Sequence, residues 1–95
     1  MTQEKIRSEK IRTFALSVTT DVKELVKKNL SRTRVYVCNT GSAIVYVLSA
    51  QNLKATDGIP VAATTGTYEN KTTTGPMWVV AASGTNDVRV EENTD

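Results

Sequence analysis

Histidine is missing from the chain, and cysteine occurs once, at position 38. Thiolate and imidazole zinc sites and Cys–His nucleophilic catalysis are therefore excluded, because each needs residues that the chain does not have. An intrachain disulfide is excluded for the same reason. Cys38 lies within an alternating apolar stretch, so we expect it to be a small hydrophobic residue of the core.

Long apolar runs and phosphate-binding glycine loops are also missing. No run approaches the roughly 18 apolar residues of a membrane span, and no signal-like apolar segment occurs near the start, so we expect a protein made in a cytoplasm without membrane contact. The glycines do not have the spacings of nucleotide-binding motifs. Asp57, Glu69 and Asp87 lie in or near expected turns, where carboxylates commonly accept backbone hydrogen bonds. We therefore expect no enzyme, no cofactor and no metal ion.

Charge is nearly balanced overall but unevenly distributed. Residues 1–34 carry nine basic and four acidic side chains, whereas residues 35–95 carry three basic and six acidic ones. Single-strand nucleic-acid binders interleave basic residues with several aromatics, and aromatics are only 5% of this chain. We favour an acidic protein surface, including the acidic end of another copy, as the partner of the basic segment. An OB-like nucleic-acid binder is the weaker alternative.

Alternation of apolar and polar residues predicts β-strands from residue 11 onward. The segment 35–47, VYVCNTGSAIVYV, repeats one tripeptide around a polar centre, which predicts a β-hairpin. Glycines at 58, 66, 75 and 84 then recur at a spacing typical of short strands joined by turns. Residues 20–28 fit a helix and a strand about equally well. We predict an all-β fold, an antiparallel β-sandwich of jelly-roll type with about eight short strands.

The two ends of the chain and its tryptophan lead to separate predictions. Glu-Lys-Ile-Arg occurs at residues 4–7 and again at 9–12, a five-residue period that matches neither helix nor strand, so we predict that residues 1–10 are an extended N-terminal arm or a solvated tail. Residues 11–91 would form the sandwich and residues 92–95 an acidic tail. We expect Trp78 to be a core or sheet-edge anchor, with stacking on a carbohydrate as the alternative.

An ordered series of short segments resembles the small β-sandwich virion proteins of tailed bacteriophages. The series begins with Asn29-Leu30-Ser31-Arg32, continues with RVYVCNTG, VYV and DGIPV, and closes with MWVVAASGTNDVRV, so that it covers roughly residues 22–90. Such proteins serve as head-decoration, head-fibre-base or tail-associated subunits. The resemblance favours a strand over a helix for residues 20–28.

The resemblance implies a structural role at the outer capsid surface of a virion. The expected partners are the major capsid protein and copies of the chain itself in a homotrimer, with no nucleic acid and no membrane. A neck, tail or fibre-base position and a host-glycan-binding module are the alternatives. We expect these residues at assembly interfaces: Lys5, Ile6, Arg7, Lys10, Ile11, Arg12, Arg32, Arg34, Trp78, Glu91 and Glu92.

Overall fold

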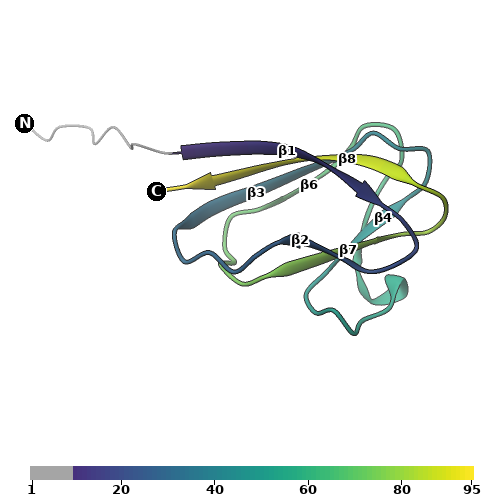
Figure 1. Cartoon of the computed structure of the whole chain (residues 1–95), viewed down its shortest axis with the longest axis horizontal. Coiled ribbons are helices and arrows are strands. Elements are labelled where there is room, and N and C mark those ends of the chain that lie inside the picture. The colour runs from purple at the N-terminus through teal and green to yellow at the C-terminus, as the bar shows by residue number, and fades with distance from the viewer. Residues whose placement is uncertain (1–9) are drawn as a thin grey trace, which may run out of the picture.

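The protein is an all-β sandwich, as the sequence predicts. The structure is a computed structural model that describes residues 10–95, and it contains eight strands and one short 3-10 helix (Figure 1). The elements are β1 Lys10–Val18, β2 Lys23–Val26, β3 Arg32–Asn39, β4 Val45–Leu48, the 3-10 helix η1 Ala55–Asp57, β5 Ile59–Val61, β6 Gly66–Asn70, β7 Met77–Ala81 and β8 Asn86–Thr94.

The strands form two antiparallel sheets of four strands each. The first sheet has the order β1-β8-β3-β6 and the second the order β2-β7-β4-β5. Only the β4–β5 connection stays within one sheet, whereas each of the other connections carries the chain across the sandwich. Consecutive strands therefore mostly lie in opposite layers, and β1, β6, β2 and β5 are the edge strands.

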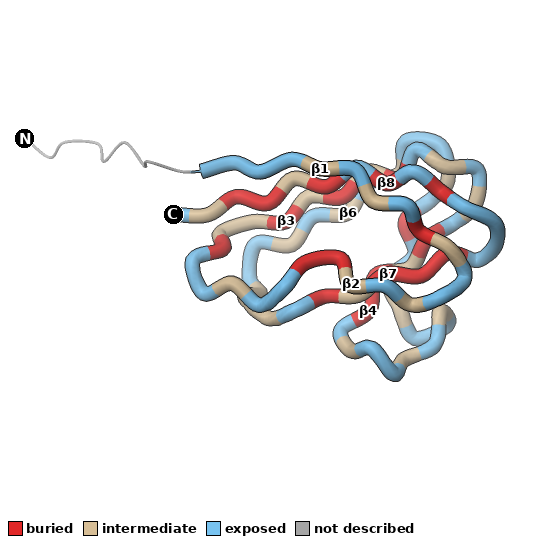
Figure 2. Tube along the Cα trace, in the orientation of Figure 1, coloured by how far each residue is buried: buried red, intermediate tan, exposed pale blue. Residues whose placement is uncertain are grey.

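The core lies between the two sheets and consists mainly of valine. Along β3 and β8, buried residues alternate with more exposed ones, and the buried positions are the red bands in Figure 2. In β3, for example, Val35 and Val37 are fully buried, while Tyr36 and Cys38 face outward and are half-buried. Cys38 is thus not the core residue that we expected, because it belongs to the opposite face from the two valines.

The predicted hairpin at residues 35–47 is wrong. Its strands are present as β3 and β4, but they belong to different sheets, so the connection crosses the sandwich. Asn39 stabilises this crossing from inside the protein. Its side-chain nitrogen donates to the carbonyls of Ala43 at 2.8 Å and Val61 at 3.1 Å, and its side-chain oxygen accepts from the Gly41 backbone N–H at 2.9 Å.

The ends of the sandwich differ from the predicted boundaries. Strand β1 begins at Lys10, one residue before the predicted start of the domain, and residues 1–9 of the predicted arm lie outside the described part of the chain. Strand β8 continues to Thr94, so most of the predicted acidic tail belongs to a sheet. Residues 20–28 contain β2, in agreement with the strand that the resemblance favours.

Candidate assembly surface

A buried arginine and a buried glutamate form the centre of an ionic cluster in the first sheet. The Arg32 side chain is fully buried and the Glu92 side chain is 5% exposed. Arg32 Nε donates to Glu92 Oε2 at 2.9 Å. The remaining Arg32 nitrogens donate to the carbonyls of Thr73 at 3.1 Å, of Gly75 at 2.9 Å and of Lys27. One guanidinium thus joins β8 to the chain segments that flank β2 and β7.

Arg12 extends the cluster to the edge strand β1. Its Nη2 donates to Glu92 Oε1 at 2.8 Å, and its guanidinium lies 4.5 Å from the centre of the Phe14 ring. Burial alone would raise the pKa of Glu92, but the hydrogen bonds from Arg32 and Arg12 outweigh it and hold that pKa below its ordinary value. Glu92 is therefore a charged carboxylate near neutral pH.

A second, more exposed group of charges lies on the outer face of the same sheet. Arg34 Nη1 donates to Glu91 Oε2 at 2.9 Å, and Arg34 Nε donates to Glu69. The Arg34 guanidinium also lies 4.8 Å from the centre of the Tyr36 ring. The hydrogen bond from Arg34 lowers the pKa of Glu69 below its usual range. These contacts are side-chain pairs across β6, β3 and β8, which are neighbours in the sheet.

The two glutamates of the predicted acidic end are paired within the chain, and pairing between copies stays a prediction. Glu91 and Glu92 bind Arg34, Arg32 and Arg12 of their own sheet, so these two glutamates are not a free acidic end for another copy. Glu69, which we assigned to a turn, lies within β6 and completes the pairing. No local pattern indicates this role, because the contact joins residues 35 positions apart.

The structure thus brings together only part of the predicted interface. Lys10, Ile11 and Arg12 lie on β1 beside the charge cluster, while Lys5, Ile6 and Arg7 fall outside the described residues. Trp78 lies in the other sheet, half-buried on the outward face of β7, where its register neighbours are Glu24 and Leu48. Since Met77 and Val79 point inward and β7 is an interior strand, Trp78 is neither a core nor a sheet-edge residue.

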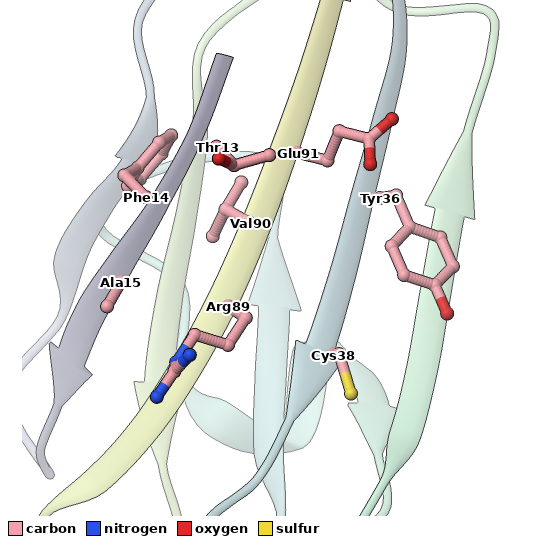
Figure 3. A pocket seen from close by; sticks show the side chains of 8 residues that line it. All are labelled: Thr13, Phe14, Ala15, Tyr36, Cys38, Arg89, Val90 and Glu91. Carbon is pink, nitrogen blue, oxygen red and sulfur yellow. The ribbon is translucent and has the colours of Figure 1, made fainter. Parts of the chain in front are cut away.

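Two hollows flank β1. On the outer face, a shallow hollow of about 340 Å³ is lined by small and polar side chains: Thr13, Ala15, Tyr36, Cys38, Arg89 and Glu91, together with Phe14 and Val90 (Figure 3). Below the edge of β1, a groove of about 440 Å³ separates the two sheets and is lined by Phe14, Leu16, Leu25 and Val26 with polar residues around them. The groove leaves Phe14 and Leu16 partly exposed along the outer edge of β1.

Within residues 10–95 no group of three or more His, Cys, Asp or Glu side chains is placed to hold a metal ion, and no helix there is long and apolar enough to cross a bilayer. Comparisons with protein-family models, with curated proteins and with solved structures gave no match for the chain.

Proposed function

We propose that the protein is a structural component of a tailed-phage virion, which binds the outer head shell and stabilises it. The observation that carries the proposal is the strand order. Two four-stranded sheets ordered β1-β8-β3-β6 and β2-β7-β4-β5, with chain crossings between layers, support assignment to the jelly rolls. Viral capsid proteins are a major group of that architecture. The resemblance in sequence points to the same class.

One end of the sandwich has the properties of an attachment surface. Figure 1 shows the start of β1, the end of β8 and the β2–β3 connection together at this end. Exposed Lys27 and Lys28 lie in that connection, and Leu30 beside them is 76% exposed. An exposed leucine close in sequence to two exposed lysines suits a capsid surface that offers an apolar pocket with an acidic rim. In this proposal the protein acts by binding and performs no reaction.

Binding of this kind would stabilise the shell by mass action. A protein that binds the assembled shell and not its dissociated subunits shifts the equilibrium toward assembly, by about 2.7 kcal/mol per site at a hundredfold excess over Kd. Particles that lack the protein should lose integrity at a lower temperature than complete particles, and added purified protein should restore the difference. Equal heat resistance of the two kinds of particle would contradict the proposal.

A pair of matched variants tests the attachment surface. Leu30→Ser should weaken binding to shells, because the side chain is solvent-exposed in the free protein and would be buried on attachment. Ile44→Ser is the control, since Ile44 is 38% exposed in the β3–β4 connection at the opposite end. Equal binding by the two variants would remove this end of the molecule from the proposal. The number of copies per particle distinguishes a shell position from a neck or tail position.

A glycan-binding module is the second candidate, because lectins also use jelly rolls and Trp78 lies on an outward face. It predicts a change in tryptophan fluorescence on addition of the bound saccharide, abolished in Trp78→Phe. A glycan array without hits would eliminate this candidate.

A further inference from the structure

The outer edge of β1 is a long strand edge without a partner among residues 10–95. The strand has nine residues, each in continuous register with β8 on its other side. Unpaired edges invite pairing with other chains, and proteins usually block them with proline, bulges, short strands or charged side chains. In β1 the charged residues are Lys10 and Arg12, both near its start. The sequence of β1, KIRTFALSV, contains no proline, and its pairing with β8 contains no register shift.

The direction of the free backbone groups follows from one contact. Lys23 Nζ donates to the Ser17 carbonyl at 2.8 Å, so this carbonyl points away from β8. Backbone groups alternate in direction along an antiparallel strand, and therefore those of Ile11, Thr13 and Ala15 point the same way. None of these three residues has a backbone hydrogen bond outside the β1–β8 ladder within residues 10–95. Since Lys23 occupies the Ser17 position, the open part of the edge is centred on Thr13.

The side chains along this edge are unusually apolar for an exposed strand. Ile11 is 60% exposed on the outer face, although it is one of the larger apolar residues of the first sheet. On the inner face, Phe14 and Leu16 are only half-buried and line the groove that separates β1 from β2. An added strand would cover both faces of the edge at once.

We propose that two copies of the chain associate through their β1 strands, antiparallel, about a twofold axis at Thr13. In this register Thr13 pairs with the partner's Thr13, and Ile11 pairs with the partner's Ala15. The pairs exchange on the order of six hydrogen bonds. The result is one continuous eight-stranded sheet, in which each exposed Ile11 packs against the small side chain of the partner's Ala15 (Figure 3 shows Thr13 and Ala15 on β1).

The side chains that β1 would place against a second β1 point to a second copy as the occupant. The antiparallel register places Arg12 opposite the partner's Phe14, an aromatic ring of the type on which Arg12 already stacks in its own chain. Arg12 also pairs with Glu92, which it shares with Arg32, and this register places the two copies of Arg12 diagonally across the axis, not directly opposite each other. Lys10 lies opposite the partner's Leu16, far from the partner's Lys10. The strand is thus complementary to itself.

This interface is independent of the virion proposal, and it differs from the homotrimer that the sequence resemblance implies. The same patch is used by both chains, so the association closes at two copies. Sedimentation or native mass spectrometry of the full-length chain should therefore show a monomer–dimer equilibrium. A monomer at every concentration, or a trimer, would overturn the proposal.

Two proline variants with the same substitution separate this edge from the other edge of the sheet. Thr13→Pro removes an N–H that the β1–β8 ladder does not use, and it should raise the dimer Kd at least about tenfold because a twofold interface loses the bond twice. Thr67→Pro is the control on β6. The Asn39 carbonyl accepts from the Thr65 N–H, so the backbone groups of the odd-numbered β3 residues point toward β6. Thr67 lies opposite Cys38, an even-numbered residue whose backbone groups point away from β6, and the Thr67 N–H therefore points outward from the sheet. Dimers that survive Thr13→Pro, or that dissociate equally in Thr67→Pro, would overturn the proposal.

Hydrogen exchange in the unmodified protein gives a test that no folding defect can obscure. Exchange of the Ile11, Thr13 and Ala15 amides should slow as protein concentration rises. The Phe14 and Leu16 amides, which face β8, should be protected to the same degree at all concentrations. Fast exchange of the three outward amides in a sample shown to be dimeric would place the interface elsewhere.

Discussion

Arg32 and Arg34 lie two residues apart in β3 and differ completely in environment. Residues at this spacing normally share one face of a strand, yet Arg32 is buried against Glu92 whereas Arg34 lies on the outer face. The register with β8 shifts between these two residues, as it does at a β-bulge, and this reverses the direction of Arg32. A sequence does not reveal such a shift, so both arginines looked equally available for an interface.

Removal of Arg32 should be among the most damaging single changes. Arg32→Leu leaves Glu92 buried with Arg12 as its remaining partner and deprives three carbonyls of a donor. Loss of one partner of a buried pair typically costs about 3–5 kcal/mol, a large share of the stability of a small domain. Urea unfolding measures the effect. Arg89→Ala, which breaks only the exposed pair with Asp87, should cost less than about 1 kcal/mol, and equal losses would contradict this account.

Glu92 should also make the stability of the fold depend on pH. The pKa of Glu92 is depressed in the folded protein, so its contribution is complete above the unfolded pKa of about 4.3 and is lost as the pH falls through the lower folded pKa. The unfolding free energy should therefore decrease below about pH 4. High salt weakens the contributions of the exposed carboxylates Glu69 and Asp87, whose pKa values are also lowered.

The matched variant for this measurement is Glu92→Gln, which keeps the shape of the side chain and removes its charge. Its stability should be lower at neutral pH and should change less than that of the original protein between neutral and acid pH. Parallel pH profiles in high salt would show that other groups control the acid transition.

Among the elements, the β3–β4 connection shows what local pattern leaves undetermined. The alternation of residues 35–47 predicts two strands and a turn, and both strands are present. The second strand crosses to the other sheet, and the side chains that hydrogen-bond to this connection, Asn39 and Asn86, are fully buried or nearly so. Asn86 lies at the start of β8, 43 positions from Ala43, whose backbone N–H donates to its side-chain oxygen at 2.9 Å. A contact of that sequence separation leaves no local signature.

Asn39 should therefore be necessary for the crossing. Asn39→Ala removes the donor for two carbonyls and the acceptor for the Gly41 N–H, which should lower the unfolding free energy by about 1–3 kcal/mol. Chemical denaturation checks the value. Ser42→Ala in the same connection is the control, because Ser42 is exposed and its change should fall within about 0.5 kcal/mol. A harmless Asn39→Ala would mean that other contacts direct the crossing.

At the scale of the whole molecule, strand positions were predictable and strand partners were not. Apolar alternation is a property of a few neighbouring residues, so the strands and their inward faces followed from it, including the Phe14–Leu16–Val18 face of β1. The sheet order joins β1 to β8 and β2 to β7, from opposite ends of the chain. The candidate site consists of such long-range pairs, which explains why Glu91 and Glu92 were mistaken for a free end.

The extent of the folded body leads to a last prediction, on the role of residues 1–9. Within residues 10–95, every buried core side chain comes from Val18 or later, and β1 begins at Lys10. Deletion of residues 1–9 should therefore leave the unfolding free energy within about 0.5 kcal/mol of the original.

If the segment anchors the protein to a shell, loss of Ile6 and its neighbouring charges should weaken attachment roughly ten- to a hundredfold, the equivalent of one buried isoleucine. A chain with residues 1–9 in shuffled order keeps length and charge, and it should also bind weakly. Full attachment by the shuffled chain would show that residues 1–9 contribute to binding only through their charge. Full attachment by the deletion variant would show that the folded sandwich alone carries the binding surface.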